Sequence, residues 1–192
     1  MRELLLTERL ILRDVTEADA ELLFDLDSDP EVMRYIGPRP ASDVAWYRER
    51  VREVFVPQQA HPWHGIRIVL DRANGEFLGW VFIRPATASG FAGEIGWTQA
   101  SEQEVGYRYC RSAWGRGIAT EAAISLVQIA FEDPAMTAVV ACARADNTAS
   151  LRVLKKLGLG PVGEVLLPCA SEPVVKLIRR KERCRIPGEQ GE

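Results

Sequence analysis

The chain has 192 residues, enough to bury a sizeable core in one compact domain or in two small ones. Hydrophobic residues make up 47% and charged residues 27%, which is ordinary globular composition and argues against disorder as the main state. The net charge of −3 lacks the basic excess of nucleic-acid-binding proteins, and no apolar run approaches the roughly 18 residues of a membrane span.

The first part of the chain predicts one strand and two helices. Alternating residues over 9–13 predict a short strand. Thr16 and Asp19 have the spacing of a capping box, which predicts a helix that begins there and ends near residue 27. Pro30 is expected at the start of a short second helix, and the proline-rich stretch 37–40 predicts a loop.

A longer helix and a hairpin are expected next. Ser42 is the predicted N-cap of this helix, whose apolar residues recur with a period near 3.6 until Pro57 ends it. Strands are predicted over 66–70 and 77–83, because the Asn-Gly pair between them is typical of a tight hairpin turn.

The middle of the chain predicts a long loop, a strand and a helix. Residues 85–102 are rich in Ala, Gly, Ser and Thr, and 94–97 are the candidate for a small strand inside this loop. A further strand is predicted over 104–109, and a helix with a buried apolar face is predicted over 118–131.

The remaining elements indicate the fold class. The nearly all-apolar run 137–143 predicts a strand buried on both faces, followed by a helix over 149–157. Two last strands are expected near 162–167 and 174–178, and the tail at 187–192 is expected to be disordered. The order of elements predicts an α/β (α+β) fold with a mostly antiparallel front half and one βαβ-like step.

Cysteine and histidine usage argues against disulfides and against a metal site. Four cysteines lie far apart without a CxxC pair, so reduced thiols are expected at Cys110, Cys142, Cys169 and Cys184. The apolar stretch at the N-terminus is too short for a signal peptide, which favours a cytoplasmic protein. His61 and His64 are too few for structural zinc, and a loop that leads into a strand is expected there.

Gly115 and Gly117 lie between the strand predicted at 104–109 and the helix predicted at 118–131. Glycines let the backbone approach a ligand, and a helix start adds unpaired N–H donors, so this spacing favours a pyrophosphate cradle. A tight turn without a ligand is an equally simple interpretation of the two glycines alone. A P-loop is excluded because no lysine follows Gly117, and a dinucleotide fingerprint because Thr120 replaces its third glycine.

Taken together, these motifs resemble the GNAT superfamily of acyl-CoA-dependent N-acyltransferases, and most of all its ribosomal-protein alanine N-acetyltransferase (RimL/RimJ) branch. The similarity is strong over 103–159 and weak over 37–63 and 85–102. The matching residues are the Thr-Glu-Arg-Leu-Ile-Leu-Arg stretch at 7–13, Gly79, Glu104 to Tyr107, Trp114 to Ala122, Asn147 to Ser150, and Val153 to Gly158. Trp114 replaces the superfamily's usual Gln or Arg, as is typical of the Rim-type branch.

The resemblance implies a single GNAT domain over 1–186. Its sheet would be mixed, mostly antiparallel and twisted, with about six or seven strands and about four flanking helices. It would split into a V between its fourth and fifth strands, here 104–110 and 137–143. Acetyl-CoA would be the co-substrate, with its pantetheine arm in the V and no metal.

The resemblance also implies which residues bind acetyl-CoA. The Tyr109 backbone would bond the pantetheine amides, the Tyr107 N–H would stabilise the oxyanion of the thioester, and Asn147 would contact the pantetheine arm. The pyrophosphate would lie on the glycine turn and helix start, formed by Trp114, Gly115, Arg116, Gly117, Ile118, Ala119 and Thr120.

Two residues are implied for the proton transfers. Glu104 is the family-matched base for the attacking amine. Many members place a tyrosine acid where this chain has Leu154, and Ser150, one turn earlier, is either the substitute acid or only a pantetheine contact. Strand parity directs Glu104 and Tyr107 to opposite faces unless a bulge lies at Gly106. Without the bulge, Glu102 or Gln103 becomes the alternative base.

The resulting functional hypothesis is an N-acetyltransferase that moves an acetyl group from acetyl-CoA to a primary amine by direct transfer in a ternary complex. The acceptor is a protein N-terminus or a small-molecule amine. The alternative is a catalytically silent acyl-CoA-binding sensor. Neither a membrane nor nucleic acid is an expected partner, and both a monomer and a homodimer are compatible with the sequence. The basic run at 179–185 is expected to be a solvated strand end.

Overall fold

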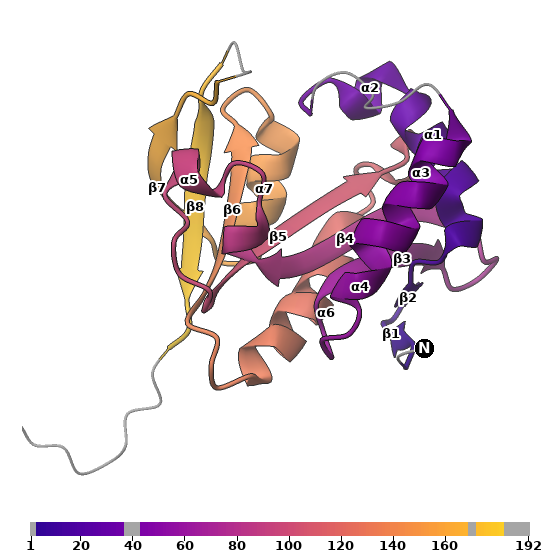
Figure 1. Ribbon diagram of the computed structural model, residues 1–192, viewed down its shortest axis with the longest axis horizontal. Coiled ribbons are helices and arrows are strands. Elements are labelled where there is room, and N and C mark those ends of the chain that lie inside the picture. Colours follow the sequence, from indigo (N-terminus) through magenta and orange to yellow (C-terminus); the bar gives the residue numbers. More distant parts are fainter. Residues whose placement is uncertain (1–2, 37–42, 169–171, 183–192) are drawn as a thin grey trace, which may run out of the picture.

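The computed structural model describes residues 3–36, 43–168 and 172–182, which build one eight-stranded sheet (Figure 1). In space the strands follow the order β1-β2-β3-β4-β5-β6-β8-β7. Neighbouring strands are antiparallel except β5 and β6, which are parallel. The strands are β1 (Leu5–Leu6), β2 (Leu10–Asp14), β3 (Gly65–Asp71), β4 (Phe77–Pro85), β5 (Glu102–Tyr109), β6 (Ala138–Arg144), β7 (Gly160–Val165) and β8 (Val174–Arg180).

Helices cover both faces of the sheet, with α6 and α7 on one face and α1, α3 and α4 on the other (Figure 1). The helices are α1 (Ala20–Ser28), α2 (Pro30–Met33), α3 (Val44–Arg50), α4 (Val56–Gln58), α5 (Ala92–Ile95), α6 (Ile118–Glu132) and α7 (Thr148–Lys156). Among the described residues, no helix is long and apolar enough to cross a membrane.

Helix α6 is held against the sheet by an apolar stripe. Ile118, Ala122, Leu126 and Ala130 recur at the four-residue spacing of one helix face, and all four are buried. They belong to the same core cluster as Val81 of β4. Burying one large aliphatic side chain of this kind contributes about 1.5–3 kcal/mol. The stripe therefore fixes the start of α6 close to the end of β5.

The mixed, mostly antiparallel α/β fold predicted from the sequence is confirmed. The capping box is present, with the Thr16 N–H donating to an Asp19 carboxylate oxygen over 2.8 Å. The helix begins there as a 3₁₀ turn, Glu17–Asp19, and continues as α1. The hairpin of β3 and β4 and the step from β5 through α6 to β6 also form as expected.

Two predictions about the strands are wrong in detail. The sheet has eight strands rather than six or seven, because the two residues of β1 pair with β2 but are too few to show a period. The expected V therefore lies between β5 and β6. Residues 94–97 do not form a strand, since α5 occupies Ala92–Ile95 and ends at Gly96 with φ +82°.

The helix predicted from Ser42 to Pro57 also differs. Its N-cap is Asp43, whose carboxylate accepts from the Trp46 N–H over 2.9 Å. It does not end at Pro57, because a π-helical turn, Val51–Phe55, leads into α4. Pro57 lies in the first turn of α4, where the N–H that proline lacks is not required. Ser42, the loop at 37–40 and the tail at 187–192 lie outside the described residues.

The parallel strands β5 and β6 separate soon after they begin. They pair at Glu102–Ala138, Gln103–Val139 and Glu104–Val140 only. β5 continues to Tyr109 and β6 to Arg144, so both strands run on beyond their last pair. We call this opening the fork. It is the split in the sheet that the sequence predicted.

Beside the fork, two glycines let β4 and β5 approach closely. A Cβ on Gly79, which has φ +141°, would lie 2.2 Å from the Arg108 carbonyl oxygen. A Cβ on Gly106 would lie 2.5 Å from the Phe82 ring. No ordinary side chain fits at either position without movement of the backbone or the ring.

Gly79→Ala is therefore expected to destabilise the protein by at least about 2 kcal/mol, because it combines backbone strain with overpacking. The matched control is Gly93→Ala in α5, where a new Cβ meets no atom within 4 Å. There alanine improves helix propensity and stability should stay equal or rise. Urea denaturation of the three proteins measures the difference, and equal midpoints for Gly79→Ala and the wild type would contradict the packing described.

Candidate active site

The edge of β5 beyond the fork presents backbone groups away from β4. The Cys110 N–H donates to the Leu78 carbonyl of β4 over 2.9 Å. Because N–H groups alternate along a strand, those of Tyr107 and Tyr109 point to the opposite side, where β6 has already separated from β5. These two residues can therefore offer donors and acceptors to a ligand.

Trp114 joins this edge to the glycine turn. Its indole Nε1–H donates to the Tyr109 carbonyl over 2.9 Å, and its side chain is half-exposed. A carbonyl oxygen has two lone pairs, so the Tyr109 carbonyl keeps one for another donor. The β5 edge thus leads directly into the turn before α6.

The turn itself has the backbone conformation that the two glycines suggested. Gly115 has φ +73° and Gly117 has φ +79°, both in the left-handed region. Gly117 is the N-cap of α6, and the N–H groups of Ile118, Ala119 and Thr120 in the first turn have no intrahelical acceptor. These donors and the positive end of the helix dipole suit an anion.

Helix α7 brings Ser150 to the Tyr107 side chain. The Tyr107 hydroxyl lies 3.0 Å from Ser150 Oγ and 3.2 Å from the Ser150 carbonyl oxygen. Asn147 is the N-cap of α7, and its Oδ1 accepts from the Ser150 N–H over 3.1 Å, which leaves its amide N–H₂ for other contacts. Burial raises the pKa of Tyr107 to about 12, although the Ser150 hydrogen bond acts in the opposite direction.

The rest of α7 points elsewhere. Leu154, which replaces the tyrosine of many superfamily members, is buried in the core cluster beneath α6 and α7. Lys155 and Lys156 are exposed in the last turn of the helix. That turn is about 12 Å from Asn147 at 1.5 Å per residue, and cations there suit the negative end of the helix dipole.

Glu104 and Tyr107 lie on opposite faces of β5. The register between β4 and β5 is regular from Gln103 to Tyr109, so the bulge considered at Gly106 is absent. Gly106 serves close packing instead, since the Phe82 ring occupies the space that a Cβ would need. Tyr107 faces α7, and Glu104 faces the side covered by α1 and α3.

Glu104 is a buried carboxylate paired with an arginine. One of its oxygens accepts from Arg84 Nε over 2.8 Å and from Arg84 Nη2 over 2.7 Å. Burial raises the pKa of Glu104, while the Arg84 charge, the hydrogen bonds from Arg84 and one from Ser89 lower it, and the net direction is upward. A carboxylate with a raised pKa is a stronger base than an exposed one.

The alternative bases are less well placed. Glu104 pairs with Val140 in the last pair before the fork, whereas Glu102 lies two residues farther back, opposite Ala138. The Gln103 side chain is buried and donates to the Ala100 carbonyl over 3.0 Å. Of the three, Glu104 is the one at the opening.

Several side chains near the fork carried no sequence signal of their own. Arg84 has no motif, and the Tyr107 hydroxyl went unassigned because only its N–H matches the family pattern. On the Glu104 face, Arg108 pairs with the buried Asp27 and lies over the Trp80 ring. The register of β4 and β5 reveals the Arg84–Glu104 pair and sets Arg108 opposite Trp80, whereas the contact with Asp27 comes from the packing of α1 on this face.

Other aromatic, histidine and cysteine side chains lie outside this arrangement. Trp63 and Trp97 are buried in the core, and Trp46 packs on Tyr47 of α3. His61 and His64 stack in the loop before β3, as expected. The described cysteines are the thiols Cys110 and Cys142, while Cys169 and Cys184 lie outside the described residues.

Arg84→Gln is expected to raise the pKa of Glu104 further. The guanidinium stabilises the carboxylate, so its loss leaves burial to act alone, and an opposite charge at this distance is worth about 1–3 pKa units. Carboxyl ¹³C NMR against pH measures the titration in the wild type, in Arg84→Gln and in the exposed control Arg50→Gln, since the ion pair described for Glu104 is with Arg84 and not with Arg50. An unchanged or lower midpoint in Arg84→Gln would show that Arg84 does not hold the carboxylate.

Comparison with known proteins matches this geometry to one family. Residues 9–160 match the profile of the acetyltransferase (GNAT) domain family. An uncharacterized N-acetyltransferase, p20 of Bacillus licheniformis, is 28% identical over 164 residues, which cover 84% of each chain.

Solved structures share the fold. RimL, a ribosomal L7/L12 alpha-N-protein acetyltransferase in complex with coenzyme A, superposes with a TM-score of 0.73 at 17% identity over 93% of this chain and 98% of its own. AAC(6')-Ib in complex with ribostamycin and coenzyme A gives 0.69 at 22% identity, over 94% and 99%. Because the family profile covers most of the chain, this protein belongs to the GNAT acetyltransferase family, whose members carry out acetyl-CoA-dependent acetylation.

Proposed function

We propose that this protein transfers an acetyl group from acetyl-CoA to a primary amine by direct attack in a ternary complex. The observation that carries the proposal is the continuous path from the β5 edge at the fork, through Trp114, to the glycine turn and the start of α6. An acyl-CoA has an amide-containing arm followed by a diphosphate. The β5 edge can pair with the amide-containing arm as a strand would, and the N–H groups at the start of α6 can bind the diphosphate.

The chemistry needs two proton transfers around one carbonyl carbon. The amine nitrogen bonds to this carbon, the C–S bond then breaks, and the sulfur leaves as a thiolate. In the proposal Glu104 takes the amine proton, directly or through a water, and the Tyr107 N–H donates to the oxyanion. Its raised pKa suits Glu104 to this role.

The regular register of β5 supports this division of labour. With the thioester paired along the β5 edge, an amine can approach from one face of the sheet while the sulfur departs toward the other. Glu104 lies on the first face and the Tyr107–Ser150 pair on the second. In the proposal, the opposite faces, a difficulty from the sequence alone, put the base beside the attacking amine and the hydrogen-bond donors beside the leaving sulfur.

On the thiolate side, Tyr107 and Ser150 act together as hydrogen-bond donors. The pKa of Tyr107, about 12, keeps its hydroxyl protonated at neutral pH. An ordinary thiol has a pKa of about 8.5, so complete proton transfer from Tyr107 to the thiolate is uphill. The pair therefore stabilises the leaving sulfur by hydrogen bonding, and solvent supplies the final proton.

Direct transfer is favoured over a covalent acyl-enzyme. Burial raises the pKa of Cys110, and raises that of Cys142 to about 12, so both described cysteines are neutral thiols at pH 7. A neutral thiol is a poor nucleophile, and no histidine lies near either in sequence.

The acceptor is proposed as a class, a protein N-terminus or a small-molecule amine. The two solved relatives by fold are described as acting on a ribosomal protein in one case and as binding an aminoglycoside in the other. The short acetyl group, the RimL-type branch and a cytoplasmic location stay part of the proposal. The domain extent of 1–186 is also part of the proposal. It is supported by β8, which pairs with β6 although it lies after residues 9–160, the part that matches the family profile.

Coenzyme A affinity should depend on Gly117. Gly117→Val forces a branched residue into φ +79° at the helix start, where a phosphate must approach. We expect CoA affinity to fall tenfold or more, about 1.4 kcal/mol, by isothermal titration calorimetry. Gly160→Val is the control, because a Cβ there meets nothing within 4 Å. Unchanged CoA affinity in Gly117→Val would rule out the cradle.

Glu104→Gln should lower the rate of thiol release from acetyl-CoA, over a panel of amines and N-terminal peptides, by roughly 10²–10⁴. The variant keeps the shape but loses the base, so CoA affinity should stay near wild type and the acidic limb of the pH–rate profile should disappear. Glu102→Gln is the matched control on the same face. A near-wild-type rate in Glu104→Gln would exclude it as the base. CoA binding without thiol release from any acceptor would favour the silent sensor.

A further inference from the structure

Residues of two motifs that carry the family resemblance meet in space, and none of these residues has a role so far. Thr7 and Arg9 belong to the stretch at 7–13, and Glu121 belongs to the first turn of α6. The Thr7 hydroxyl donates to Glu121 Oε1 over 2.6 Å, and the Arg9 backbone N–H donates to the same oxygen over 3.0 Å. The contact spans more than 110 positions of sequence.

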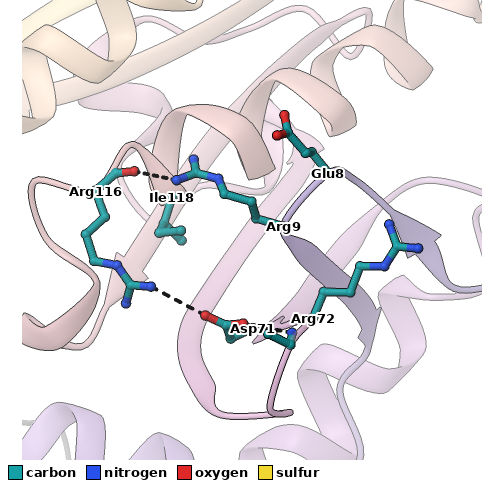
Figure 2. Close-up of a pocket in the computed structure, with 7 residues that line it drawn as sticks. Glu8, Arg9, Asp71, Arg72, Arg116 and Ile118 are labelled. Carbon is teal, nitrogen blue, oxygen red and sulfur yellow. Dashed lines mark hydrogen bonds and ion pairs between the residues drawn. The ribbon is translucent and has the colours of Figure 1, made fainter.

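Arg9 completes the contact with its side chain. Its Nε lies 2.7 Å and its Nη2 2.6 Å from Glu121 Oε2. Its Nη1 donates to the Arg116 carbonyl over 2.9 Å, inside the glycine turn, as Figure 2 shows. One guanidinium therefore links the first turn of α6 to the backbone between Gly115 and Gly117.

A second layer of bonds holds this arrangement from the β3–β4 hairpin. The Arg72 N–H donates to the Arg9 carbonyl over 2.8 Å, and Arg72 Nη1 donates to the Thr7 carbonyl over 3.0 Å. Asp71 lies 3.4 Å from Arg116 Nη2. These side chains surround a hollow of about 370 Å³ beside Ile118 (Figure 2).

Apolar packing contributes little to the shape of the turn on this side. A Cβ on Gly115 would meet no atom within 4 Å, and a Cβ on Gly117 would meet only Arg9 Nη2, at 3.5 Å. A side chain at Gly117 would therefore contact only the Arg9 guanidinium. Core burial of Ile118 holds the start of α6, and the bonds from Arg9 restrain the turn on its open side.

The charges are also matched to a phosphate ligand. A carboxylate in the first turn stabilises a helix but repels an anion bound at the same end. Burial raises the pKa of Glu121, but the bonds from Thr7 and Arg9 outweigh it and hold the pKa below its ordinary value. Arg9 neutralises this fixed charge, and of its five N–H groups the three bonds described use three.

We propose that Thr7, Arg9 and Glu121 form a clamp that positions the phosphate-binding turn at 115–117 and offsets the Glu121 charge beside it. These are positioning residues for the nucleotide end of the co-substrate, so the inference rests on the proposed function. The clamp acts on the phosphates and not on the pantetheine arm, which pairs with β5 on another part of the path.

The test uses Glu121→Gln in the full chain, with Glu132→Gln as its control. Glu132 is the exposed last residue of the same helix, so the control makes the same substitution at the far end of α6. Calorimetric titrations with CoA and with ADP measure the nucleotide end. Turnover of acetyl-pantetheine, which lacks the nucleotide, measures the arm and the chemistry.

Removal of the Glu121 charge by itself favours an anion, so a net loss of affinity isolates the positioning role of the clamp. For Glu121→Gln we expect CoA and ADP to bind roughly tenfold more weakly, the scale of one hydrogen bond to a charged group. Turnover of acetyl-pantetheine and the melting temperature should stay near wild type. Arg9→Lys should behave like Glu121→Gln, because an ammonium cannot bond the carboxylate and the Arg116 carbonyl as a planar fork does. The double variant should be no weaker than either single variant.

Wild-type CoA affinity in Glu121→Gln and Arg9→Lys would overturn the clamp while leaving the proposed function intact. Equal losses with acetyl-CoA and acetyl-pantetheine, together with a lower melting temperature, would show a purely structural role and also overturn it. If the wild type itself binds no CoA, the proposed function fails and the clamp fails with it.

Discussion

The site depends on one feature of the backbone, the short parallel pairing of β5 and β6. Parallel strands need a long crossover, and here α6 supplies it by running back along the sheet. The start of α6 is thereby fixed next to the end of β5. Because the pairing stops after Glu104–Val140, the strand edge that leads to this helix start has no strand partner on the side of β6. Strand edge and helix start thus arise from a single topological step.

Successive side chains of β5 point to opposite faces of the sheet, and this separates the two groups of polar side chains. Tyr107 faces α7 and reaches Ser150, whereas Glu104 faces the opposite side and reaches Arg84. The residue between them must be glycine, because the Phe82 ring occupies the space that a side chain at Gly106 would need. A regular strand therefore holds a carboxylate and a phenol on opposite sides of the same edge, and the proposed mechanism needs no bulge.

The sequence predicted what is local and what repeats. The apolar stripe of α6, the Thr16–Asp19 box and the glycine turn at 115–117 were readable because each depends on neighbours along the chain. Pairings across the sheet, such as Arg84 with Glu104, were not readable because the register that makes them is set by distant strands. The sequence left open a bulge at Gly106, because the Phe82 contact that requires glycine there is tertiary.

The two-sided arrangement of β5 has an evolutionary consequence. If the donor is held by backbone groups and by the α6 and α7 side, substitutions on the other face, around Trp80 and Arg108, can alter the choice of amine while the acyl donor stays the same. A lineage with this sheet can then acquire new acceptors by changing a few positions of β4 and β5 on that face. Few substitutions are then needed to change the substrate range, because the strand edge joined to a helix start is inherited unchanged.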